Sequence, residues 1–268
     1  MNIQEHDEIR QQVREAYGAV ARAESAGGCC APSTGCCAPS DASVAELLSQ
    51  GIGYSAAETA IVPEGANLGL GCGNPQAIAA LKAGETVLDL GSGAGFDAFL
   101  AARAVDATGT VIGVDMTPDM VSKARANAVK GGYTNVDFRL GEIEHLPVAD
   151  ATVDVIISNC VINLSPNKPQ VFRDAFRALK PGGRLAISDI VTTAELPAEM
   201  QREVALYTAC VAGAANVEEL TAMLADAGFT EIRIAPKDAS REFIRNWAPG
   251  RGVEDYIASA TIEAVKPN

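Results

Sequence analysis

The sequence predicts an α/β fold in which a doubly wound, mostly parallel sheet carries helices on both faces. Short apolar runs alternate with helical patterns between residues 86 and 190, the order typical of parallel strands joined by crossover helices. A glycine-rich loop at residues 91–95 follows the first run. With 268 residues, 48% of them hydrophobic, the chain can bury one large core and still carry an appended lobe.

The N-terminal part is expected to be a helix followed by a flexible segment. Apolar residues between Ile9 and Val20 recur at helical spacing and predict an amphipathic helix over Glu5–Glu24. Residues 25–43 turn to Ala, Gly, Ser, Pro and paired cysteines, a composition that packs poorly.

Residues 86–190 are predicted to alternate between strands and helices. Five parallel strands are predicted, over Thr86–Leu90, Val111–Asp115, Val136–Leu140, Val153–Ser158 and Arg184–Ile190. Three helices are predicted between them, over Phe96–Val105, Pro118–Lys130 and Lys168–Leu179.

The sequence also predicts the elements after Val191 and the division into domains. Beyond Val191 we expect helices Pro197–Val211 and Val217–Ala227, a strand Glu231–Ala235 and an antiparallel final strand Ile257–Val265. The expected division is an N-terminal helix with a Cys-rich segment (1–43), a nucleotide-binding domain (44–190) and a substrate lobe that completes the sheet (191–268).

Charge and cysteine content narrow the class of protein. The formal charge of −13 disfavours nucleic acid and anionic membranes as partners, since both bind through Lys/Arg clusters. The start is too charged for a signal peptide, and no apolar stretch approaches the roughly 18 residues of a membrane span. We therefore expect a cytoplasmic protein whose seven cysteines remain thiols.

The glycine-rich loop indicates a nucleotide cofactor other than NAD. A strand, the sequence Gly91-Ser-Gly-Ala-Gly95 and a helix in succession place backbone N–H groups and a positive helix end at the sheet's carboxyl edge. The dinucleotide fingerprint requires its third glycine three residues after the second, where this chain has Phe96.

The sequence Asp89-Leu-Gly-Ser-Gly-Ala-Gly95 resembles motif I of class I S-adenosylmethionine-dependent methyltransferases, which have a Rossmann-like fold. Asp115, the segment 141–147 and the turn 179–183 continue the resemblance in the family's order. The resemblance implies that S-adenosylmethionine is held by Asp89, Gly91, Ser92, Gly93, Gly95, Asp115, Met116, Glu142, Ile143 and Asn159. For Glu142 and Ile143, packing of the loop is an equal alternative to contact with the adenine. Tyr17 resembles an aromatic residue that closes over this cofactor, although packing of the helix alone is an equal alternative.

Three isolated cysteines narrow the resemblance further. The segments around Cys72, Cys160 and Cys210, together with residues 246–250, are similar to arsenite S-adenosylmethionine methyltransferases, from about Val13 to the C-terminus. This implies that the three thiols bind arsenite, or thiol-bound trivalent arsenic, for methylation in arsenic detoxification. Trivalent arsenic is soft and prefers thiolates, and its lone pair carries no proton, so the transfer needs no general base.

The paired cysteines Cys29, Cys30, Cys36 and Cys37 are candidates for an accessory redox role. In the resembling family a further N-terminal cysteine joins in redox recycling, which implies a thiol reductant of the glutathione or thioredoxin type. These pairs could also capture arsenite and pass it inward, form a flexible scavenging tail, or have no function, and the sequence favours none of these alternatives.

Two other functions remain open from the residues. A small-molecule C- or O-methyltransferase of the ubiquinone or sterol type would share the cofactor motifs, but it gives no reason for three dispersed thiols. A non-catalytic metalloid-binding protein would keep the thiols without forming a methylated product. The sequence leaves the number of methyl groups added and the oligomeric state undetermined.

Overall fold

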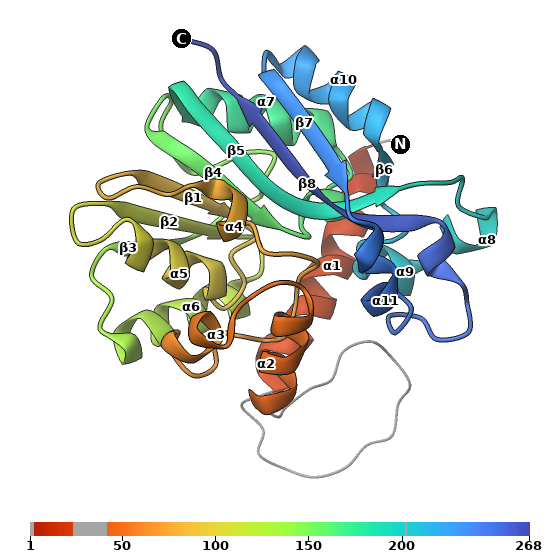
Figure 1. The fold of residues 1–268 in the computed structure, drawn as a ribbon, viewed down its shortest axis with the longest axis horizontal. Helices are drawn as coiled ribbons and strands as arrows, with labels where there is room; N and C mark the ends of the chain where they lie inside the picture. The colour runs from red at the N-terminus through yellow and green to blue at the C-terminus, as the bar shows by residue number, and fades with distance from the viewer. Residues whose placement is uncertain (1–2, 24–41, 202) are drawn as a thin grey trace.

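The computed structural model is built around one sheet with the strand order β3-β2-β1-β4-β5-β8-β7, and β6 pairs with β5 off this path (Figure 1). The structure describes residues 3–23, 42–201 and 203–268. The strands are β1 (Thr86–Leu90), β2 (Thr110–Asp115), β3 (Val136–Leu140), β4 (Val153–Asn159), β5 (Leu179–Thr192), β6 (Ala215–Asn216), β7 (Thr230–Pro236) and β8 (Ile257–Val265). Strands β1 to β5 pair in parallel, whereas β8 is antiparallel to β5 and β7. The predicted fold class is confirmed.

Helices cover both faces of this sheet. They are α1 (Ile3–Ala23), α2 (Ala42–Gly51), α3 (Ala56–Ile61), α4 (Gln76–Ala79), α5 (Phe96–Ala104), α6 (Pro118–Gly131), α7 (Lys168–Ala178), α8 (Ala198–Gln201), α9 (Val204–Thr208), α10 (Val217–Ala227) and α11 (Arg241–Ile244). Within the described residues, none of them combines the length and apolar character needed to cross a bilayer.

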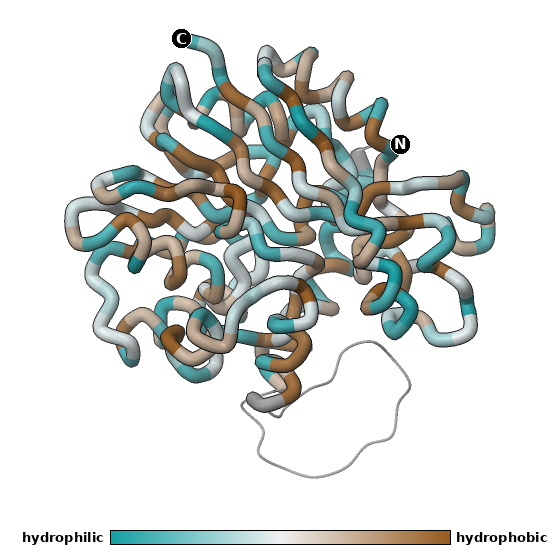
Figure 2. The backbone as a smooth tube through the Cα atoms, viewed as in Figure 1, coloured by the Kyte–Doolittle hydropathy of each residue, from teal (hydrophilic) through white to brown (hydrophobic). Residues whose placement is uncertain are grey.

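Successive residues of the central strands point to opposite faces of the sheet and belong to two separate hydrophobic cores. On β1, Val87 packs with α5 and α6, whereas Leu88 faces the core that α7 and α10 complete. Both side chains are fully buried. Figure 2 shows the hydrophobic positions concentrated along these central strands. The sheet is therefore rigid, and its carboxyl edge offers a fixed frame for the loops that follow each strand.

Local sequence signals set the helix ends. Helix α6 has Pro118 in its first turn and ends at Gly132, whose left-handed φ of 68° lets its N–H reach back to the helix. Helix α10 begins with a capping box, in which Asn216 and Glu219 each accept a hydrogen bond from the other's backbone N–H.

The single helix predicted over Pro197–Val211 is wrong, because the chain forms the short helices α8 and α9 instead. Helix α9 ends before Cys210, which has a left-handed φ of 62°. Beyond it, Gly213 lies so close to the backbone oxygen of Asn163 that a Cβ would come within 2.2 Å. The chain must turn inward here, and this tertiary contact overrides the helical propensity of the alanine-rich sequence.

Two glycines of the loop between β1 and α5 serve different purposes. Gly93, at φ 51°, has no atom within 4 Å of where a Cβ would stand, so it leaves open space beside the loop. Gly95, at φ 98°, is packed so tightly that a Cβ would lie 2.6 Å from the Phe99 ring and 2.8 Å from the Phe138 ring. Gly95 therefore sets how closely α5 approaches the sheet.

We predict that Gly95→Ala lowers the free energy of unfolding by about 2–4 kcal/mol, because it adds overpacking to a strained backbone. The matched variant Gly93→Ala adds only the left-handed strain, roughly 1–2 kcal/mol. Urea denaturation of both variants measures the difference. Equal losses of stability would contradict the packing role of Gly95.

Candidate functional site

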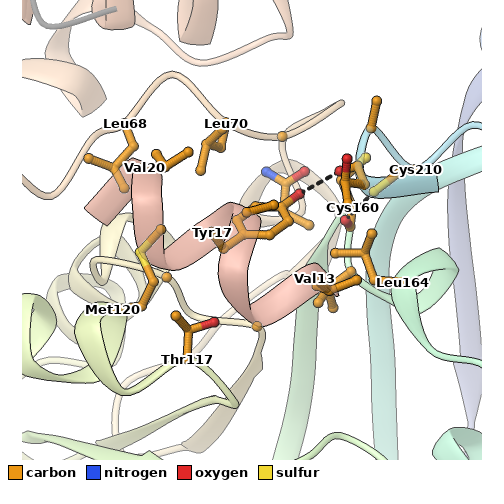
Figure 3. A pocket seen from close by; sticks show the side chains of 18 of the residues that line it. Val13, Tyr17, Val20, Leu68, Leu70, Thr117, Met120, Cys160, Leu164 and Cys210 are labelled. Atoms are coloured by element: carbon orange, nitrogen blue, oxygen red, sulfur yellow. Dashed lines mark hydrogen bonds between the residues drawn. The ribbon is translucent and has the colours of Figure 1, made fainter. Parts of the chain in front are cut away.

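A cavity of about 610 Å³ opens at the carboxyl edge of the sheet and joins the cofactor loop to two of the cysteines. Helix α1 covers it, and Figure 3 shows Tyr17 projecting from α1 across the cavity toward Cys160 and Cys210. The Tyr17 hydroxyl donates a hydrogen bond to the backbone oxygen of Thr208, at 3.1 Å. The predicted site residues that line the cavity are Asp89, Gly91, Ser92, Gly93, Asp115, Met116, Ile143, Asn159, Cys160 and Cys210.

The cofactor side of the cavity has buried polar atoms that lack a protein partner. Asp89 is 2% exposed, its Oδ2 has no hydrogen bond, and burial raises the pKa of its carboxyl well above the usual value. The buried hydroxyl of Ser92 also lacks a partner. Asp115 accepts hydrogen bonds from the backbone N–H groups of Gly93 (3.0 Å) and Thr117 (2.8 Å).

These features fit S-adenosylmethionine. A buried carboxylate oxygen without a partner is costly unless a ligand supplies a donor or a positive charge, which the ammonium of the cofactor's methionine end carries. The open space beside Gly93 allows a ligand to approach the backbone closely. Asp115, at the end of β2, stands where an acidic side chain accepts ribose hydroxyls in such folds.

Two of the residues expected to bind the cofactor lie elsewhere. Glu142 lines a smaller neighbouring pocket and pairs with two arginines of α1, Arg14 at 2.6 Å and Arg10 at 3.4 Å. Gly95 packs against Phe99 and does not line the cavity. Through these two ion pairs, Glu142 helps to hold α1 over the site.

The three isolated cysteines converge at the other end of the cavity. The sulfurs of Cys72 and Cys160 and a carboxylate oxygen of Asp189 all lie within 4.8 Å of one another. The thiol of Cys210 donates to the backbone oxygen of Cys160, at 2.8 Å. Cys72 and Cys210 are 1% and 2% exposed. Cys160 and Cys210 line the cavity, whereas Cys72 does not.

The backbone holds Cys160 and Cys210 in an unusual conformation. Their φ angles are 58° and 62°, in the left-handed region that β-carbon-bearing residues avoid at a cost of roughly 1–2 kcal/mol each. Cys160 follows β4 directly, and its N–H donates to the backbone oxygen of Ser188 on β5, at 2.8 Å. Non-glycine residues held in this region concentrate at functional sites.

Asn159 connects the Cys72 loop to the cofactor side. Its Oδ1 accepts the backbone N–H of Cys72, at 3.0 Å. Its Nδ2 lies 2.8 Å from the backbone oxygen of Gly73, 2.9 Å from the Tyr54 hydroxyl and 3.3 Å from the Asp97 carboxylate. Tyr54 in turn donates to Asp97, at 2.7 Å. Asn159 therefore both lines the cavity and fixes the position of a thiol.

Burial keeps the thiols protonated at neutral pH. It raises the pKa of Cys72 to about 11. The hydrogen bond with Cys160, together with burial, raises the pKa of Cys210 well above the usual value.

Sequence reasoning missed Asp189, Tyr54 and Asp97. Asp189 is 1% exposed and burial raises its pKa to about 6, although backbone N–H donors oppose this shift. A carboxylate inside the apolar run 185–191 was the signal that could have found it. The cysteines Cys29, Cys30, Cys36 and Cys37 lie outside the described residues.

Comparison with known proteins agrees with this geometry. A family model described as a methyltransferase domain matches residues 81–228. The arsenite methyltransferase of Halobacterium salinarum is 54% identical over 97% of this chain and 67% of that protein. That of Aquipseudomonas alcaligenes is 38% identical over 84% of this chain and 63% of that protein. This chain thus spans about two thirds of the length of these relatives.

Solved structures show the same fold. The crystal structure of an arsenic(III) S-adenosylmethionine methyltransferase from Chlamydomonas reinhardtii matches with a TM-score of 0.60 and 31% identity, over 84% of this chain and 73% of that one. Phosphoethanolamine N-methyltransferase 2 of Haemonchus contortus, 21% identical over 74% of this chain and 54% of that one, has a TM-score of 0.60 and supports the fold alone. The chain belongs to the arsenite methyltransferase family.

Proposed function

We propose that this chain transfers a methyl group from S-adenosylmethionine to trivalent arsenic bound by Cys72, Cys160 and Cys210. The observation that carries the proposal is the convergence of three thiols from separate segments, two of which, Cys160 and Cys210, line the same cavity as the glycine loop and Asp89. The relatives named as arsenite methyltransferases support the choice of substrate.

The thiols bind and orient the substrate. As(OH)₃ exchanges its three hydroxyls for three cysteine sulfurs, and each thiol proton leaves with a hydroxyl as water. The bound arsenic keeps a lone pair opposite its three sulfurs. For a third As–S bond, Cys210 must turn its sulfur away from the backbone oxygen of Cys160, where it now donates.

Positioning is the main contribution of the protein. Bound S-adenosylmethionine supplies a methyl group on a positively charged sulfur, which becomes a neutral thioether when the methyl leaves. Asp89 and Ser92 would hold this cofactor at one end of the cavity while the thiols hold arsenic at the other. Holding two reactants in line and excluding water contributes on the order of 7–11 kcal/mol.

Each domain has its own role in the proposed reaction, and a reductant is needed after the transfer. Residues 44–190 hold the cofactor and provide Cys72 and Cys160, and the lobe 191–268 adds Cys210. A thiol reductant of the glutathione or thioredoxin type returns methylated arsenic to the trivalent state, with the N-terminal cysteines as accessory thiols. These free thiols suit the reducing cytoplasm.

We predict that Cys72→Ser, Cys160→Ser and Cys210→Ser each reduce methylation of arsenite by at least about 100-fold, because the substrate loses a bond that sets its position. Mass spectrometry of the arsenic species formed with S-adenosylmethionine and a thiol measures the effect. Cofactor affinity is the internal control and should be unchanged. A fully active Cys210→Ser enzyme would remove that residue from the site.

We predict that the affinity for arsenite is nearly constant between pH 6 and pH 8. The pKa of Cys72 is about 11, and that of Cys210 is also raised, so both thiols stay protonated over this range. Their protons leave as water together with the arsenic hydroxyls, and binding therefore has no net proton uptake or release. Fluorescence titration with arsenite at several pH values tests this. A tenfold change per pH unit would show that binding starts from a thiolate.

A further inference from the structure

The donor set at the inner end of the cavity differs from the one that arsenic requires. Two sulfurs, of Cys72 and Cys160, lie with a carboxylate oxygen of Asp189 in one group, whose atoms are within 4.8 Å of one another. Within the described residues, Cys210 is not part of this group. The arrangement present is therefore two sulfurs and one oxygen.

Trivalent arsenic binds a carboxylate oxygen only weakly, because it is a soft centre that prefers sulfur. A borderline d¹⁰ divalent cation accepts this mixture. Zinc takes cysteine sulfur and Asp oxygen together, and sites with three protein ligands leave a fourth position to water.

We propose that Cys72, Cys160 and Asp189 form a binding site for a thiophilic divalent cation, Zn²⁺ or its softer analogue Cd²⁺, which excludes arsenite while it is bound. The exclusion of arsenite rests on the proposed function. Binding of the cation does not.

The geometry needs only a small adjustment. Two Zn–S bonds of about 2.3 Å in a tetrahedron put the sulfurs roughly 3.8 Å apart. The two sulfurs lie within 4.8 Å of each other, so their spacing exceeds this value by at most about 1 Å. Both Cys72 and Asp189 are almost completely buried, so a cation here would be shielded from water on its inner side.

Hydrogen bonds from neighbouring residues hold the Asp189 carboxylate in place. Its Oδ1 accepts from the backbone N–H of Ile190 (2.7 Å) and from Asn163 Nδ2 (2.9 Å), and its Oδ2 accepts from the backbone N–H of Ile162 (2.9 Å). A carboxylate has about four acceptor positions, so Oδ2 can still bind a cation. Outer hydrogen bonds of this kind fix a ligand and strengthen a metal site.

Binding of the cation and of arsenite differ in their proton balance. Cd²⁺ forms two Cd–S bonds as two S–H bonds break, and the two protons pass to the solvent without any electron transfer. Arsenite releases its thiol protons as water. Cation affinity therefore rises with pH, and arsenite affinity does not.

The binding test uses the full-length chain with Cys29→Ser, Cys30→Ser, Cys36→Ser and Cys37→Ser, so that other thiols do not compete. CdCl₂ is titrated by calorimetry and by the ultraviolet absorbance of cadmium thiolate. We expect one cadmium ion per chain. Cys72→Ser and Cys160→Ser should each weaken binding by at least about 100-fold, and Asp189→Asn by about 10-fold.

Cys210→Ser is the matched control, because it removes a thiol outside the donor group. Cadmium affinity should fall by no more than about tenfold in this variant, since Cys210 contacts Cys160 only through a hydrogen bond, while arsenite affinity falls by at least about 100-fold. If Cys210→Ser weakens cadmium binding as much as Cys160→Ser, the cation uses the three thiols and the proposed donor set is wrong. Absence of cadmium binding overturns it as well.

If Asp189→Asn fails to fold, the site can still be tested with its three donor residues unchanged. The ¹¹³Cd chemical shift of the loaded chain distinguishes two sulfur ligands from three, and we expect two. A three-sulfur shift contradicts the site.

Competition between the divalent cation and arsenite is the last measurement. ZnCl₂ should inhibit arsenite methylation in a way that excess arsenite relieves. Cadmium binding without inhibition by either ion would overturn the exclusion. Cadmium binding in a chain that methylates no arsenical would instead count against the proposed function and leave the cation site intact.

Discussion

The hydrogen bonds of a single amide side chain, Asn159, hold the two halves of the site in register. One end of the amide carries the backbone of Cys72, and the other meets Tyr54 and Asp97 beside the cofactor loop. Asn159 is the last residue of β4, a central strand that pairs with β1 and β5, and Asn159 itself pairs with Ser188 of β5. The strained backbone at Cys160, the next residue, persists because this rigid frame over-determines it.

Most of the sheet could be predicted from the sequence because buried parallel strands are continuous apolar runs, and β1 and β3 have the predicted bounds. The antiparallel β8 was also predicted correctly. Helices α2 to α4 were not predicted, and α2 begins at Ala42, within the segment 25–43 that was expected to be flexible. The failure at α9 has a different cause, because contacts distant in the sequence decide where that segment turns.

The cofactor loop could be predicted because its glycines have a local geometric purpose that is visible in the sequence. The convergence of Cys72, Cys160 and Cys210 was suggested by resemblance alone, since nothing local brings together residues so far apart. Asp189 was missed for the same reason: its neighbours come from the segment after β4, and only the folded chain places them around it. Glu142 was given a cofactor role because sequence motifs do not reveal the arginines of a distant helix.

Helix α1 is fastened unevenly across the cavity, and this gives its two ends different sensitivities to ionic strength. Near its start, Arg10 pairs with Glu144 at side-chain exposures of only 13% and 4%. Toward its end, Arg22 pairs with Asp119 at 61% and 42%, where solvent ions screen the attraction strongly. Added salt thus weakens the Arg22–Asp119 pair more than the Arg10–Glu144 pair, so the contribution of ion pairs to holding α1 depends on ionic strength mainly at its C-terminal end.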